Sequence, residues 1–110
     1  MQSKTYTRSA FLRGHPAVIA DKILTASAET TFAAGSVLML KEGKAVLADN
    51  TVTSATLIGI LAGETTITPQ GTLAAVILHA DADLSQLKIA SGATAATVAA
   101  VLRDAGIYAY

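Results

Sequence analysis

The sequence predicts a small, mainly β protein of the α+β class, with a β-barrel-like or sandwich core behind an extended N-terminal arm. Three observations support this prediction. Short apolar runs alternate with single glycines, as strands alternate with turns, and one amphipathic helix follows them near the C-terminus. The first 31 residues show no sustained hydrophobic period. We therefore expect an arm over residues 1–31 and a compact β-rich domain over residues 32–110.

The arm is rich in Ser, Thr, Lys and Arg and carries scattered apolar side chains, including Tyr6, Phe11 and Leu12. These side chains would gain about 25 cal/mol per Å² of apolar area if a partner buried them. The stretch Ser3–Ser9 favours extended structure, because threonine and tyrosine have high strand propensity. The alternative is a disordered tail in which the apolar residues have no role.

The compact part begins with a predicted hairpin. Ser36–Leu40 is a continuous apolar run, Glu42 and Gly43 form the turn, and Lys44–Asp49 returns as the second strand. We expect residues 51–55 to form a loop or a weak edge strand.

Three further strands follow. Leu57–Ala62 has the composition of a buried strand, in which Gly59 marks a bulge or a close backbone approach. Thr65–Thr68 is short and leads into a turn at Pro69–Gly71. Thr72–His79 is the longest strand candidate.

Two helical segments are predicted in the last third of the chain. Asp83 can cap a short helix that ends near Leu87. A longer helix is expected over Ala95–Ala105, with Thr94 as its N-cap, because apolar residues recur there with helical spacing. Gly106 occupies the position of a C′ glycine, and Ile107–Tyr110 resembles a terminal strand.

The composition of the chain argues against several classes of function. The 110 residues form one domain, of which 52% are hydrophobic and 15% charged, and eight basic residues balance eight acidic ones. This balance argues against nucleic-acid binding, which needs clustered Lys and Arg. No apolar run is long enough for a membrane span, no signal peptide is expected, and cysteine is absent. A core of this size is marginal alone, so we expect the protein to form oligomers.

Catalytic and metal-binding motifs are weak. His79, Asp81 and Asp83 alternate and could face one side of a strand as metal ligands, or they could simply be the polar end of a strand that enters a helix cap. No nucleophile elbow, phosphate loop or dinucleotide fingerprint occurs. We therefore expect no enzyme activity, no metal and no cofactor.

A carrier role is the main alternative from another class. Lys41 lies near a hairpin turn, as does the modified lysine of biotinyl or lipoyl carrier domains, but the tip itself is better placed at Glu42 and Gly43. The chain would then be a small β-rich carrier or ligand-binding domain with a disordered tail.

Four short pieces, taken in order and spacing, resemble the head decoration proteins of tailed bacteriophages, the lambda type. The pieces are Val37–Leu40, Lys44–Asp49, Ile58–Ala62 and Asp104–Ile107. The resemblance covers about residues 35–110, and the arm before this range is similar in character but not in motif.

The resemblance implies a capsid decoration (cement) protein. Such proteins are β-rich domains that bind the outer surface of the expanded phage head as homotrimers and stabilise it by bridging major capsid subunits. Their N-terminal arm adds a strand to the major capsid protein. For this chain it implies a virion protein made in the host cytoplasm, with no nucleic-acid or membrane partner.

The arm residues expected to bind the capsid are Lys4, Thr5, Tyr6, Thr7, Arg8, Phe11 and Leu12. The loop after the first hairpin and the turn before the longest strand are the candidate trimer contacts. Their residues are Val52, Thr53, Thr56, Pro69 and Gln70.

Overall fold

The structure, a computed structural model, describes residues 17–110. Over this range the chain forms eight strands, one short 3-10 helix and one α-helix. In order, these are β1 (Val18–Leu24), β2 (Thr30–Phe32), β3 (Val37–Lys41), β4 (Lys44–Leu47), β5 (Leu57–Leu61), β6 (Thr65–Ile67), β7 (Thr72–Ala82), η1 (Leu84–Gln86), α1 (Ala95–Asp104) and β8 (Ile107–Ala109).

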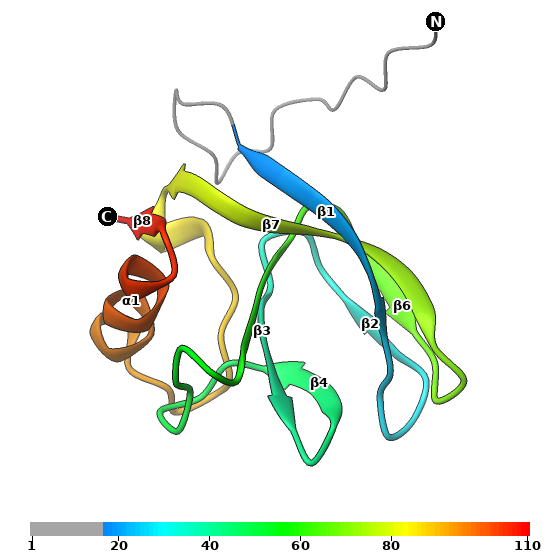
Figure 1. Cartoon of the computed structure of the whole chain (residues 1–110). Coiled ribbons are helices and arrows are strands. Elements are labelled where there is room, and N and C mark those ends of the chain that lie inside the picture. The colour runs from blue at the N-terminus through cyan, green and yellow to red at the C-terminus, as the bar shows by residue number, and fades with distance from the viewer. Residues whose placement is uncertain (1–16) are drawn as a thin grey trace, which may run out of the picture.

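The strands form a mostly antiparallel six-stranded sheet and a separate two-stranded ribbon (Figure 1). In the sheet the order is β1-β7-β5-β3-β4, and β8 joins the far end of β7 as its only parallel neighbour. β2 and β6 make the ribbon. The predicted mainly β class with one C-terminal helix is confirmed.

The centre of the sheet is buried on both faces, by different elements. On one face, Val37, Ile60 and Ile77 pack with the α1 residues Val98 and Leu102. On the other face lies a second cluster, which joins the ribbon to β3, β5 and β7. Its members include Phe32, Leu38, Ile58, Ile67 and Val76. This double burial explains why β3 and β5 are continuous apolar runs, because a strand covered on both faces needs no polar side.

A bulge in β7 lets this long strand serve both cores. Val18 pairs with His79 but Ile19 pairs with Ile77, so β7 carries one extra residue at this point. Before the bulge, Val76 faces the ribbon-side core, whereas after it Ala80 and Ala82 face the helix-side core. An extra residue shifts the alternation of side chains, which is how the strand exchanges faces.

The local predictions in the compact part hold. The β3–β4 hairpin turns at Glu42 and Gly43, whose φ angles are 54° and 79°, as a type I′ turn requires. Asp83 caps η1 by accepting a hydrogen bond from the Ser85 backbone N–H. Thr94 is the N-cap of α1, although its hydroxyl makes no cap hydrogen bond. Its backbone N–H instead donates to Asn50 Oδ1 at 2.8 Å.

The predicted boundary at residue 31 is wrong, because β1 and β2 lie inside the range assigned to the arm. β1 pairs with β7 at seven positions, so the compact unit includes it. The sequence hides this strand because it lies at a sheet edge. Its burial pattern leaves Asp21, Lys22 and Ile23 all exposed in a row, so no alternation of polar and apolar residues marks it.

No helix among residues 17–110 is long and apolar enough to cross a membrane.

Candidate functional site

The arm residues predicted to bind the capsid, Lys4 to Leu12, lie outside the described residues. The structure shows where the arm joins the domain. Val18 begins β1, which lies at the edge of the sheet and pairs, among the strands of residues 17–110, only with β7. Thus the first 17 residues lead directly into a sheet edge.

The predicted trimer contacts divide into two separate regions. The segment between β4 and β5 lies on the α1 side of the molecule in Figure 1, whereas the turn between β6 and β7 lies at the opposite side. Pro69 and Gln70 are exposed in that turn. The two regions therefore do not form one continuous surface.

Val52 must be removed from the set of trimer contacts. Its side chain is only 5% exposed and belongs to the helix-side core. Its neighbours Thr53 and Thr56 close the loop by bonding to each other, with Thr53 N–H donating to Thr56 Oγ1 at 2.9 Å. The loop therefore turns Val52 inward, which the polar residues around it do not reveal.

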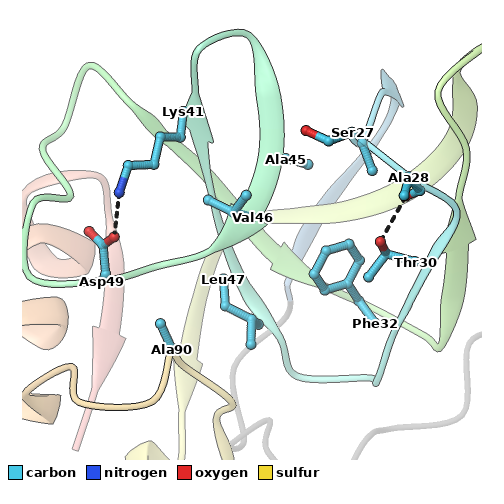
Figure 2. Close-up of a pocket in the computed structure, with 11 residues that line it drawn as sticks. Ser27, Ala28, Thr30, Phe32, Lys41, Ala45, Val46, Leu47, Asp49 and Ala90 are labelled. Carbon is cyan, nitrogen blue, oxygen red and sulfur yellow. Dashed lines mark hydrogen bonds and ion pairs between the residues drawn. The ribbon is translucent and has the colours of Figure 1, made fainter.

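A groove of about 500 Å³ lies along the β4 edge (Figure 2). We call it the β4 groove. It runs between β4 and the segment that connects β1 to β2. Its lining residues are Ala26, Ser27, Ala28, Thr30, Phe32, Lys41, Ala45, Val46, Leu47, Asp49 and Ala90. Apolar side chains dominate this lining.

The groove follows the strand edge itself. Ala45 belongs to the ribbon-side cluster and Leu47 packs against it, whereas Val46 packs against the helix-side core, so residues from both faces of β4 contribute to the lining.

The hydrogen-bond pattern shows which backbone groups of β4 face the groove. The Ala48 N–H donates to the Val37 carbonyl at 2.8 Å, and the register places Leu38 opposite Leu47. Because hydrogen-bonded and non-hydrogen-bonded pairs alternate in an antiparallel ladder, Leu47 and Ala45 point their backbone groups away from β3. Accordingly, the Ala45 N–H donates outward, to the Thr25 carbonyl at 2.7 Å.

The outward groups of Leu47 are open. Among residues 17–110, neither the N–H nor the carbonyl of Leu47 has a hydrogen-bond partner. An open strand edge beside apolar side chains is the arrangement that accepts an extended peptide as an additional strand.

An ion pair lies at the groove, where Lys41 Nζ contacts Asp49 Oδ2 at 3.1 Å. Asp49 also accepts hydrogen bonds from the Thr51 hydroxyl and backbone N–H. These two bonds, followed by the one from Lys41, lower the pKa of Asp49 to about 2. The carboxylate therefore stays charged over the ordinary pH range and holds the ammonium of Lys41.

Lys41 does not occupy the position of a carrier lysine. It pairs with Lys44 at the last position of the hairpin ladder, while the tip consists of Glu42 and Gly43.

Within residues 17–110, no three His, Asp or Glu side chains come close enough to hold a metal ion. His79 and Asp81 share one side of β7 beyond the bulge, and Asp83 is used to cap η1.

Exposed apolar side chains mark two other places. Ile23 and Leu73 are 68% and 61% exposed and face each other across β1 and β7. Tyr108 and Tyr110 are exposed near the C-terminus, on and just after β8. Sequence reasoning missed both places, and it also missed the β4 groove. The groove gathers Ala26, Phe32 and Leu47 from segments that no short motif connects.

Comparison of the chain with protein-family models and curated proteins found no match.

Proposed function

We propose that this protein is a capsid decoration protein, which binds the outside of an expanded phage head as a homotrimer and bridges major capsid subunits. The observation that carries the proposal is the sequence resemblance, in the order and spacing of its four pieces. Those pieces correspond to β3, β4, β5 and the junction of α1 with β8. They comprise the inner strands β3 and β5, the edge strand β4 and the helix end, all of which contribute to the cores, so the resemblance concerns the framework of the domain.

Surface composition supports a protein that works in an assembly. The chain has zero net charge and only 15% charged residues, and it exposes the Ile23–Leu73 pair and two tyrosines. Such a surface favours association over solubility as a monomer. A closed ring of three copies would cover part of it.

The proposed attachment uses the N-terminal segment. An extended segment that joins a sheet edge gains main-chain hydrogen bonds, and its alternate side chains fill pockets. Ordering it costs about 1–2 kcal/mol per residue in backbone entropy. Three segments on one trimer would combine modest individual affinities into strong binding to the shell.

A binding experiment with phage heads tests the proposal. The full chain and a variant lacking residues 1–16 would be mixed with expanded heads that lack a decoration protein, and with unexpanded heads. We expect the full chain to sediment with expanded heads only, and the truncated protein to stay in the supernatant. The deletion must end before Val18, because removing residues 1–20 would also cut into β1.

Two results would contradict the proposal. If the full chain does not bind expanded heads, the protein is not a decoration protein. If the truncated protein binds as well as the full chain, the N-terminal segment is not needed for attachment. Circular dichroism of the truncated protein serves as the folding control.

The alternative is a small β-rich ligand-binding or carrier domain. The volume of the β4 groove favours it, because small-molecule sites span about 300–1,000 Å³. A lysine-linked group found in the intact mass of the protein would support this alternative.

A further inference from the structure

We propose that the β4 groove binds the N-terminal segment of a second copy, with residues 3–9 added as a strand along β4. Free copies would then cover one another's open edges until the shell offers a competing edge. This inference rests on the proposed function, since it uses the same segment as the strand donor. The contact itself, however, lies between copies of this chain and needs no capsid.

The first support is the unmatched backbone of β4. The N–H and carbonyl of Leu47 face the groove and have no hydrogen-bond partner within residues 17–110. Because Ala45 lies two residues before Leu47 on the same strand, its carbonyl faces the groove as well. The Ala45 N–H on this edge is already taken by the Thr25 carbonyl, so an added strand would pair with the Ala45 carbonyl and with both groups of Leu47. An uncovered edge of this kind otherwise invites aggregation, which natural proteins avoid by covering or charging the edge.

The second support is the chemistry of the groove. The side chains of Ala26, Phe32 and Leu47 offer apolar contacts, and Ser27 and Thr30 add hydroxyls on the side opposite β4. In an added strand, Tyr6 would lie on one face and Thr5 and Thr7 on the other, because side chains alternate. The aromatic side chain of Tyr6 would then meet the apolar lining, while Thr5 and Thr7 would lie toward the hydroxyls of Ser27 and Thr30.

The third support is the reach of the chain. Ala26 lines the groove just beyond the end of β1, whereas the arm joins the domain at the other end, at Val18. The seven residues of β1 span about 23 Å. The eight residues 10–17 span at most about 28 Å. A segment returning to its own groove would need an almost straight path along a curved domain, whereas the groove of a second copy can approach the segment from any side and carries no such limit.

Disulfide trapping tests this contact, because the chain contains no cysteine. A Thr7→Cys variant would be mixed with a Thr30→Cys variant that carries a mass tag, under mild oxidation. Each copy then holds one thiol, so any bond between residues 7 and 30 joins two copies. As the matched control, Thr7→Cys would be mixed with Thr97→Cys, which places the thiol on an exposed position of α1.

We expect the 7–30 product to form about tenfold faster or more than the 7–97 product, because binding raises the local thiol concentration. Adding Tyr6→Ser to the Thr7→Cys variant should slow the formation of the 7–30 product. This substitution changes no residue of the range 17–110. Leu47→Pro, which removes the outward N–H, should slow it as well.

Equal rates at positions 30 and 97, or no effect of Tyr6→Ser, would overturn the inference. The head-binding experiment separates it from the proposed function. If heads bind the full chain but trapping fails, only the groove contact is wrong. If trapping succeeds but no head is bound, the groove contact stands and the decoration role is wrong.

Discussion

Gly59 shows how a single residue sets the packing of the sheet centre. It lies in β5 with a φ angle of 142°, which side chains rarely adopt. A Cβ atom there would lie 2.5 Å from Val76 Cγ1 and 2.6 Å from the Ile77 carbonyl oxygen. Both contacts belong to the neighbouring strand β7, so the glycine permits the close approach of β5 and β7.

We expect Gly59→Ala to destabilise the protein by about 3 kcal/mol or more, because overpacking and backbone strain add. The matched control is Gly63→Ala, since a Cβ atom at that position meets nothing within 4 Å. The control should stay within about 0.5 kcal/mol of the wild type. Urea unfolding followed by circular dichroism measures both, and equal midpoints for the two variants would contradict the prediction.

At the scale of elements, Asp49 connects the end of β3 to the loop after β4. Its carboxylate holds Lys41 on one side and both donors of Thr51 on the other. The pKa of Asp49 is lowered to about 2 by these partners, with the Thr51 hydroxyl as the largest cause. A carboxyl with a depressed pKa contributes stability above its unfolded pKa and loses it as the pH falls through its folded pKa.

We therefore expect part of the acid sensitivity of the protein, between about pH 4 and about pH 2, to come from Asp49. Asp49→Asn should lose less stability than the wild type over this interval, and Thr51→Val should lie between the two because the backbone N–H and Lys41 remain. Urea midpoints measured from pH 5 downward test this order. Parallel pH curves for all three proteins would show that the carboxylate contributes nothing.

At the scale of the whole molecule, two cores share one sheet, and β1 belongs to that sheet. Leu24 at its end is 6% exposed and lies in the ribbon-side core. The range that starts at residue 17 therefore keeps all the core residues described above, whereas a range starting after Leu24 lacks an entire strand.

Two truncated proteins, one that keeps β1 and one that lacks it, test whether β1 is part of the folding unit. We expect removal of residues 1–16 to leave the free energy of unfolding within about 0.5 kcal/mol of that of the full chain, because it removes none of the core residues described in residues 17–110. Removal of residues 1–24 should cost about 3 kcal/mol or more, since it deletes the buried Leu24 and the seven pairs with β7. Two truncations with the same midpoint would show that β1 does not belong to the cooperative unit.

Several elements could be predicted from the sequence, because the residues that specify them are close together in the chain. The β3–β4 hairpin follows from two apolar runs around Glu42 and Gly43, and α1 follows from its apolar stripe and Gly106, whose φ angle is 94°. β1 could not be found this way. Its partner β7 is about fifty residues away, and its exposed face removes the alternation that marks a strand.

The sequence by itself determined the β-rich class, the order of the strands from residue 36 onward, the C-terminal helix and the low charge. These depend on neighbouring residues, since periodicity and turn chemistry act over a few positions. Only the tertiary structure decided that β1 completes the sheet, that Val52 is buried and that the β4 edge borders an apolar groove. Those features depend on which distant strands pair, and the pairing comes from the burial of both sheet faces by α1 and the ribbon.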